Sequence, residues 1–515
     1  MSTSGDRHLR PEPSGRLKGL VTGPRIVVVR AAMPYAGTFA GQVLLQLLVN
    51  LLCRQFGVID TVRLEIPSIP TDLRAFPFPH LRAATLPEQL MALGRAVGGD
   101  EVQVALAGHS GYVRPAGTPS TTVEVIAGST PRSEPFTVVA WGDGWDAFCS
   151  TAAAPPFTTG FSLVPYGPLL AACLASGAVF RHFHQVTRAP TSYLCLWDFG
   201  TAGAGHVCAG ASLGSVRLPS AHLIGLGAVG AAFALALAMT SELSGELVGI
   251  DPQETDVTGR NRLLSAFYDE IDAAKVELAA RFFEGTQIRF WPNAGRWPEY
   301  ATDPRRQSPP DVRREEERFR YPWVFSCVDR NLHRQNIARY LPQHVLSGST
   351  DGLVAQATYY AMVGPCECLA CNHPLPTFSL EDRVEELHGL SPSERRLKYD
   401  AWGLAPAAQA AIDEYLYHPE CGHAAEAELR RLGVDGTTDW SVGFVSAAAG
   451  VMLAASFSRC AVDGVAQAVG MRAERRLIFL APDEFVRSNA RRKPECSVCG
   501  DARIQARFQQ RWDLS

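Results

Sequence analysis

The sequence predicts an α/β protein in which a second α/β domain follows a first. The stretch AHLIGLGAVGAAFALALAMTSELSGELVGID, from Ala221, has the pattern of a strand, a glycine turn, an alanine-rich helix and a second strand. Nearer the N-terminus, RIVVVR, GTFAGQVLLQLLVNLLCRQFG and VRLEIP have the pattern of strand, buried helix and strand without a glycine turn. At 515 residues and 46% hydrophobic composition, the chain also exceeds one ordinary core, so we expect two or three domains.

The predicted elements divide the chain in order. Residues 1–20 are polar and rich in Pro and Gly, which predicts a disordered tail. Residues 21–195 form the first α/β domain, and the βαβ pattern restarts over 196–365. Residues 366–440 are expected to leave the sheet as a polar, mostly helical excursion, and 441–515 to return through a buried Ala/Gly-rich helix. The halves are either related α/β units, of which only the second has a nucleotide loop, or two unrelated domains.

A charged segment and a predicted strand follow one another in the second domain. DPRRQSPPDVRREEERFR, at 303–320, is too charged and proline-broken for a core element and predicts a surface insertion. YPWVFSCVD then predicts a strand that ends at Asp329.

Net charge, the N-terminal sequence and the cysteine content restrict the partners, location and cysteine chemistry that we expect. A net charge of -4 gives no electrostatic reason to expect a nucleic-acid partner. The first residues lack a signal-peptide core, and we expect no membrane-spanning run and a cytoplasmic location. Thirteen cysteines scattered through such a chain favour reduced thiols, metal ligands or catalysis over disulfides.

The glycine turn predicts a nucleotide site. Gly225, Gly227 and Gly230 form a Gly-x-Gly-x-x-Gly pattern between strand and helix, where backbone N–H groups and the helix dipole face a phosphate. Asp251 ends the next strand, where a carboxylate accepts hydrogen bonds from ribose hydroxyls. This Rossmann-like unit suits NAD and ATP equally, and a tight turn without a ligand has the same pattern.

Two cations favour ATP. Arg262 follows Asp251 by eleven residues and Lys275 follows Arg262 by thirteen. Hydride transfer has no need of cations there, whereas displacement of pyrophosphate builds negative charge that fixed cations stabilise. With these residues the chain resembles the ThiF-type superfamily of ATP-dependent adenylating enzymes, which includes ubiquitin-activating enzymes and activators of bacterial sulfur carriers.

The resemblance covers roughly residues 196–515 and implies a ThiF-type adenylation domain. Asp251, Arg262 and Lys275 match family positions, while Gln253 replaces a second Asp and Gly259 an Asn. The amide of Asn261 is a candidate substitute for the latter. In FSCVDRNLHRQNIARYLP, Asp329 and Arg334 keep the family spacing, Arg330 replaces an Asn, and the family role of Asp329 is to hold ATP-bound Mg²⁺.

Two Cys-x-x-Cys pairs predict a structural zinc site. Cys368 and Cys371 form one pair and Cys496 and Cys499 the other, and four thiolates suit tetrahedral Zn²⁺. The family has the same two pairs flanking its crossover region. Cys366 is then a spare ligand or a bystander.

The excursion holds one more cysteine. The resemblance implies that Cys421, in YLYHPECGHAAEAEL, attacks the acyl-adenylate to form a thioester. His418, Glu420 and His423 surround it and would lower its pKa, which favours the nucleophilic thiolate. A structural cysteine is the alternative.

The resulting hypothesis is an enzyme that uses ATP and Mg²⁺ to activate a ubiquitin-like protein for transfer to a conjugating enzyme, in a bacterial antiviral pathway. PYGPLLAACLASGAVFRHF is similar to a helix of the inactive adenylation-like halves of fused ubiquitin-activating enzymes, so the first domain would brace the second. The alternatives are a sulfur-carrier activator without a thioester step, an NAD(P)-dependent oxidoreductase and a non-catalytic scaffold.

Overall fold

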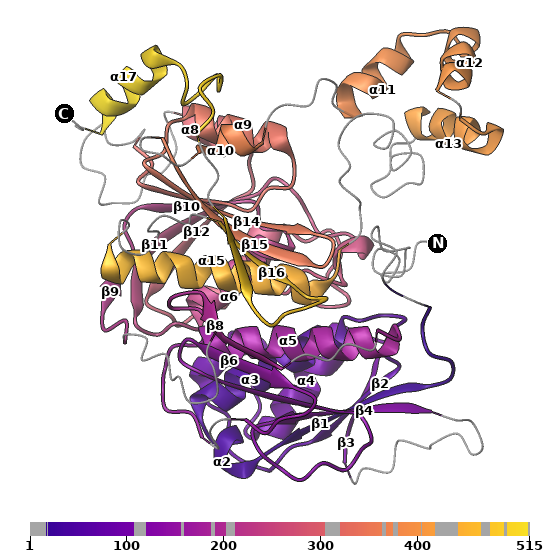
Figure 1. Ribbon diagram of the computed structural model, residues 1–515, viewed down its shortest axis with the longest axis vertical. Helices are drawn as coiled ribbons and strands as arrows, with labels where there is room; N and C mark the ends of the chain where they lie inside the picture. The colour runs from indigo at the N-terminus through magenta and orange to yellow at the C-terminus, as the bar shows by residue number, and fades with distance from the viewer. Residues whose placement is uncertain are drawn as a thin grey trace.

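The computed structural model has an α/β fold built on two sheets. It describes residues 17, 19–107, 120–155, 159–186, 191–201, 212–303, 320–362, 367–373, 380–402, 404–417, 441–464, 474–488 and 492–512. We call residues 17–201 the first half and residues 212–512 the second half. In Figure 1 the first half, in indigo and purple, lies below the second.

The first sheet begins parallel and ends antiparallel. Its strand order is β3-β2-β1-β4-β5-β6-β7-β8. The pairs from β3 to β5 are parallel, and those from β5 to β8 are antiparallel. The strands are β1 (Arg25–Ala31), β2 (Thr61–Glu65), β3 (Gln103–Leu106), β4 (Thr121–Ala127), β5 (Thr137–Asp143), β6 (Asp146–Ser150), β7 (Ser192–Cys195) and β8 (Gly200–Thr201). This sheet therefore extends beyond the boundary expected at residue 195.

The second sheet has the corresponding order. It runs β12-β11-β10-β13-β14-β15-β16-β17, with β9 paired to β11, and it changes from parallel to antiparallel after β14. Its strands are β9 (Val216–Arg217), β10 (Ala221–Ile224), β11 (Leu243–Ile250), β12 (Ile288–Asn293), β13 (Trp323–Ser326), β14 (His344–Asp351), β15 (Val354–Ala361), β16 (Glu474–Ile478) and β17 (Phe485–Ser488).

The helices of the two halves follow the same plan around their sheets. Those of the first half are α2 (Met33–Ala36), α3 (Phe39–Cys53), α4 (Leu86–Gly98) and α5 (Tyr166–Phe183), with short 3₁₀ turns η1 (Leu73–Ala75) and η2 (Pro79–Leu81). Those of the second half are α6 (Ala228–Ala238), η3 (Val257–Gly259), α7 (Lys275–Ala280), η4 (Arg281–Phe283), α8 (Trp297–Thr302), α9 (Asn331–Arg339), α10 (Leu369–Asn372), α11 (Leu380–His388), α12 (Pro392–Ala401), α13 (Pro406–Tyr417), α15 (Gly443–Asp463) and α17 (Ala502–Arg511).

Buried helices join the halves. α5 and α15 pack against each other across the junction, α3 packs on α5, and α6 packs on α15 (Figure 1). All residues of α3 and nearly all of α5 are buried, which explains why both sequences are mostly apolar, although α3 also buries Gln42, Gln46 and Asn50. One continuous hydrophobic core therefore runs through both halves.

Helix α15 corrects one expectation. By length and composition it is apolar enough to cross a membrane, although no such run was expected. However, 83% of its apolar window is buried inside the protein. Its composition is accounted for by packing between α5, α6 and the second sheet.

A small helical lobe projects from the second half. Helices α11, α12 and α13 lie apart from both sheets (Figure 1). They share a core of their own, formed by Leu387, Tyr399, Leu404, Ile412, Tyr415 and Leu416. They lie between β15 and α15, where the first half connects β6 to α5 over residues 151–165 alone.

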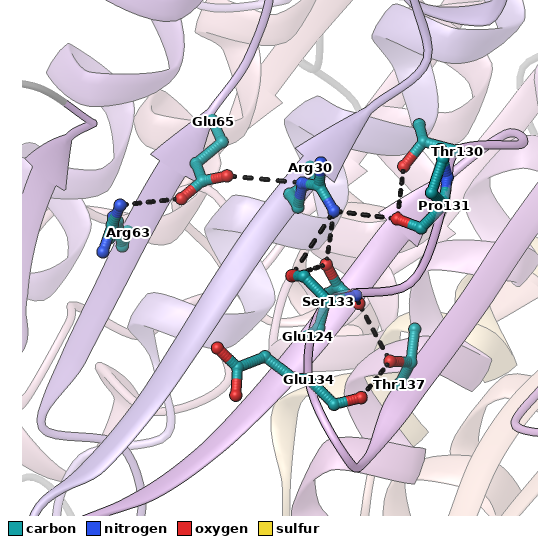
Figure 2. A network of polar contacts seen from close by, with 9 residues as sticks. All are labelled: Arg30, Arg63, Glu65, Glu124, Thr130, Pro131, Ser133, Glu134 and Thr137. Carbon is teal, nitrogen blue, oxygen red and sulfur yellow. Dashed lines mark hydrogen bonds and ion pairs between the residues drawn. The ribbon is translucent and has the colours of Figure 1, made fainter.

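In the first sheet, charged side chains lie at the ends of β1 and β2. These strands correspond to β10 and β11 of the second sheet, where the glycine turn follows β10. Arg30, in the penultimate position of β1, forms an ion pair with Glu65 at the end of β2, and Arg63 also contacts Glu65 (Figure 2). Arg30 also lies 2.7 Å from the fully buried carboxylate of Glu124. Burial opposes ionisation of Glu124, but the N–H of Ser133 and the Arg30 guanidinium outweigh it and lower its pKa to about 2. Glu65, the carboxylate at the end of β2, is therefore already paired with Arg30 and Arg63.

We predict that Gly450→Ala destabilises the junction between α15 and α6. A Cβ at this position would lie 2.6 Å from the Cβ of Ala232 and 2.6 Å from the backbone nitrogen of Phe233. Overpacking of this kind costs about 1–3 kcal/mol, and thermal unfolding followed by circular dichroism measures it. Gly37→Ala is the control, because its Cβ would make only ordinary contacts. Equal unfolding midpoints for the two variants would contradict the close approach of these helices.

Candidate nucleotide site and cysteine cluster

The glycine turn is closed on one side and open on the other. Gly225 has φ +89°, a conformation that favours glycine, and a Cβ there would lie 2.7 Å from the carbonyl oxygen of Cys327. A Cβ on Gly230 would lie 1.9 Å from the carbonyl oxygen of Gly225. At Gly227, no heavy atom lies within 4 Å of the position of a Cβ. The first and third glycines are thus required by packing, and the second leaves the backbone accessible.

Helix α6 begins at this open position. Gly227 is its N-cap, and no side chain caps the helix. The first N–H groups of a helix lack intrahelical partners and carry the positive end of its dipole. These N–H groups directly after β10 are of the kind that binds anions in other proteins.

The carboxylate of Asp251 forms a hydrogen bond with the backbone of the glycine turn. Its carboxylate is 5% exposed and accepts hydrogen bonds from the backbone N–H of Leu226, at 2.6 Å, and of Gln253, at 2.8 Å. Burial raises the pKa of Asp251, and Lys275 together with these two N–H groups opposes the rise. The carboxylate thus fixes both the glycine turn and the chain after β11.

Lys275, the first residue of α7, contacts the segment that follows Asp251. Its Nζ donates to Oε1 of Gln253 at 2.7 Å, and its backbone N–H donates to the carbonyl of Gln253. In the sequence, Gln253 stands only as a departure from the family pattern. In the structure this residue orients the lysine, a role that no local sequence pattern indicates.

The predicted Arg262 lies in a compact loop beside these groups. Its Nη1 donates to the carbonyl of Thr258 at 2.6 Å and to Oδ1 of Asn261 at 3.1 Å. Burial raises the pKa of Asp256, but hydrogen bonds from the Thr258 hydroxyl and the Gly259 N–H, together with the charges of Arg262 and Lys275, lower it overall. The two predicted cations therefore share one neighbourhood, and Asp256 is a member of it that the sequence did not indicate.

Gly259 and Asn261 shape that loop. The N–H of Gly259 donates to the Asp256 carboxylate at 2.7 Å, which closes the turn of η3. Asn261 is 1% exposed, and its amide lies 3.4 Å from the carbonyl oxygen of Ser441. Since the same amide accepts from Arg262, Asn261 links this loop to the start of α15. Its role as a substitute nucleotide ligand stays a prediction.

Asp329 lies at the exposed end of the segment after β13. Its charge raises the pKa of Asp251, and it also interacts with His333 of α9. Since β10 pairs with both β11 and β13, Asp251 and Asp329 follow the two strands beside the glycine turn, and oxygen ligands of this kind suit Mg²⁺. Arg330, the N-cap of α9, is exposed.

The side chain of Arg334 contacts Asn331 in its own helix and His373, next to the first cysteine pair. It is 8% exposed, and its Nη1 lies 3.2 Å from Oδ1 of Asn331 and 3.4 Å from Nδ1 of His373. Burial and the Arg334 charge lower the pKa of His373 to about 3. Arg334 thus joins α9 to the segment of the first cysteine pair.

The two cysteine pairs come together as predicted. The Sγ atoms of Cys368, Cys371, Cys496 and Cys499 all lie within 4.8 Å of one another. The Sγ–Sγ distances are 3.8 Å for Cys368 and Cys371, 3.7 Å for Cys368 and Cys496, and 3.2 Å for Cys371 and Cys499. Tetrahedral Zn²⁺ with Zn–S bonds of about 2.3 Å requires edges of about 3.8 Å. The four thiols therefore fit a structural metal that ties the loop before α17 to α10.

Other cysteines are placed only in part. Cys421 and Cys366, with His418, Glu420 and His423, lie outside the described residues, as does most of the charged insertion at 303–320. Cys195 is disulfide-bonded, which differs from the expectation of reduced thiols. Cys460 is a buried residue of α15, as expected for a core position.

Comparisons with known proteins give distant likenesses. No protein-family model matches the chain. The uncharacterized protein y4jF of Sinorhizobium fredii (strain NBRC 101917 / NGR234) is 31% identical over 192 residues, which are 35% of this chain and 36% of y4jF. The chain thus spans about a third of the length of the curated relative it matches.

Among solved structures, Escherichia coli MccB with ATP aligns at 14% identity and a TM-score of 0.34, covering 55% of this chain and 66% of MccB. The microcin C7 biosynthetic enzyme MccB in complex with N-formylated MccA aligns at 13% identity and a TM-score of 0.35, covering 55% of this chain and 67% of MccB. At these values the likeness assigns neither an activity nor a site residue to this chain.

We predict one zinc ion per chain, bound by the four cysteines. Cys368→Ser should lower the zinc content and the thermal unfolding midpoint, because it removes a thiolate ligand from a closed site. Elemental analysis of the purified protein measures the first effect and circular dichroism the second. Cys460→Ala removes a thiol outside the cluster and should leave the zinc content unchanged. A folded wild-type protein without bound metal would contradict the assignment.

Proposed function

We propose that this protein is an ATP-dependent adenylating enzyme that activates a carboxylate. One observation carries the proposal: Asp251 accepts the N–H of Leu226 in the glycine turn and is linked through Gln253 to Lys275, beside the uncapped N-terminus of α6. Asp329 follows β13, the strand that pairs with β10. An anion site, a buried carboxylate, a neighbouring carboxylate and a nearby cation together suit a magnesium nucleotide. Arg262 adds a second cation in the same neighbourhood.

In this proposal each residue has a defined task. The N–H groups at the start of α6 bind phosphate, and Asp251 accepts hydrogen bonds from the ribose. Asp329 would hold Mg²⁺, which supplies charge neutralisation at the phosphates. Lys275 and Arg262 face the two phosphates that leave.

Activation is then a displacement at the α-phosphate. A carboxylate oxygen of the substrate forms a bond to the α-phosphorus, and the bond from that phosphorus to the bridging oxygen breaks. The electron pair leaves with pyrophosphate, whose charge Lys275 and Arg262 stabilise. The product is an acyl-adenylate.

The substrate in this proposal is the C-terminal carboxylate of a ubiquitin-like protein. The thiolate of Cys421 attacks the acyl carbon, AMP leaves, and the thioester passes to a conjugating enzyme in a bacterial antiviral pathway. The support is the long connection between β15 and α15, which contains Cys421 and a lobe with its own core. An activator without a thioester step has no need of this excursion.

The adenylation step predicts the behaviour of the two cations. Lys275→Ala and Arg262→Ala should each reduce ATP–pyrophosphate exchange by about 10²–10³-fold, because each removes a charge that acts in the transition state. Exchange is measured with a panel of ubiquitin-like proteins that end in a free carboxylate. Lys398→Ala and Arg503→Ala are matched controls, since these cations belong to the lobe and to the exposed face of α17. Wild-type exchange rates in both site variants would remove these residues from the active site.

The thioester step predicts a covalent adduct on Cys421. With ATP, Mg²⁺ and the cognate ubiquitin-like protein, the wild type should form an adduct that survives denaturation and is released by a thiol reductant. Cys421→Ala should abolish the adduct and retain pyrophosphate exchange, because adenylation uses only the nucleotide site. Gel electrophoresis with and without reductant separates these outcomes.

The other cysteine variants serve as comparisons. Cys366→Ala should form the adduct normally. If Cys421→Ala forms it instead and Cys366→Ala does not, the acceptor is Cys366. Pyrophosphate exchange without any adduct in the wild type would make the protein a sulfur-carrier type of activator.

A further inference from the structure

A buried arginine of the first half holds the loop that carries Arg262. Arg54 follows α3 directly and is 2% exposed. Its guanidinium donates to the carbonyl oxygens of Arg260 and Ala266, each at 2.6 Å, and lies 3.4 Å from that of Leu264. These three carbonyls flank Arg262 on both sides along the chain.

Arg54 is itself held in place. Its Nε donates to Oδ1 of Asn50 at 2.7 Å, one turn earlier in α3. Burial lowers the pKa of Arg54 to about 9, so the guanidinium remains charged at neutral pH. A charged, buried side chain whose hydrogen bonds go to one loop constrains that loop strongly, because breaking them would leave buried groups unsatisfied.

The same loop has a second attachment to the first half. The backbone N–H of Tyr268 donates to the carbonyl of Ala96 at 2.8 Å, and the Tyr268 ring covers Gly99, where a Cβ would lie 2.3 Å from it. The guanidinium of Arg260 lies 4.2 Å from the centre of that ring. Residues 260–268 are therefore fastened to the first half at both ends.

The opposite side of the loop is closed by α15. A Cβ at Gly443 would lie 2.9 Å from the carbonyl oxygen of Asn261 and 3.5 Å from Cα of Arg262. The backbone at Arg262 thus lies between the first half and the start of α15. Its position depends on how the two halves pack.

We propose that Arg54 is a positioning residue of the nucleotide site. By binding three carbonyls of the loop, it fixes the direction in which Arg262 presents its guanidinium to the outer phosphates of ATP. The first half then acts on the site without touching the nucleotide. This inference rests on the proposed function, since it takes Arg262 as a phosphate ligand. The planar fork of Arg54 is essential to it, because a lysine ammonium does not reproduce that donor geometry.

The test is isothermal titration calorimetry of the full chain with Mg·ATP and with AMP. Arg54→Lys should weaken ATP binding by about 10-fold and change AMP binding by less than about 2-fold, because AMP lacks the phosphates that Arg262 faces. In an Arg262→Ala background, Arg54→Lys should change ATP affinity by less than about 2-fold, since the two residues act as one unit. This non-additivity distinguishes positioning from a general loss of structure.

Arg181→Lys is the matched control. Arg181 is 3% exposed, belongs to α5 and donates across the junction to the carbonyl of Phe479, outside the Arg262 loop. Its variant should bind ATP like the wild type. Asn50→Ala gives a milder second test, because it keeps Arg54 but removes the acceptor that orients it, and it should weaken ATP binding in the same selective way.

Several results would overturn the inference. They are unchanged ATP affinity in Arg54→Lys and Asn50→Ala, equal losses for ATP and AMP, and additivity with Arg262→Ala. If the wild type binds ATP tightly and these variants do so too, only the role of Arg54 fails. If the wild type binds neither nucleotide, the proposed function fails with it.

Discussion

The carboxylate of Asp251, buried beneath the glycine turn, connects the parts of the candidate site. One of its oxygens accepts the N–H of Leu226 and the other that of Gln253. Gln253 in turn accepts from Lys275, so the glycine turn, the buried carboxylate and a cation are linked through three hydrogen bonds. Burial disfavours the charged form, and the N–H groups and Lys275 offset this effect. Loss of this carboxylate would leave buried donors unsatisfied and release both the turn and the lysine.

The two halves use the same strand order for different purposes. In the second half, the ends of β10 and β11 present an open glycine turn and Asp251. In the first, the ends of β1 and β2 present Arg30 and Glu65, which pair with each other. The first half contributes a long apolar face to the junction. In addition, Arg54 donates hydrogen bonds to the loop of the second half that contains Arg262. The first half thus contacts the loop that contains Arg262 and packs against the second half along the junction.

Local patterns predicted much of this arrangement. The strands at 25–31, 61–65 and 221–224, the buried helices α5 and α15 and the cysteine cluster all follow from periodicity or from ligand spacing, which depend on nearby residues. The Gln253–Lys275 bond, the contacts of Arg334 and the hydrogen bonds of Arg54 join residues far apart in sequence, so no periodic pattern indicates them. Helix α15 is apolar enough to cross a membrane because it is buried in the protein, and the sequence predicted that burial.

The most direct test of a nucleotide site at the glycine turn is a crystal structure with Mg²⁺ and ATP. We expect the phosphates at the N-terminus of α6, the ribose hydroxyls on Asp251, and Lys275 and Arg262 facing the outer phosphates. A nucleotide bound elsewhere on the protein would contradict this expectation. So would a crystal grown with both ATP and NAD that contains only NAD at the turn.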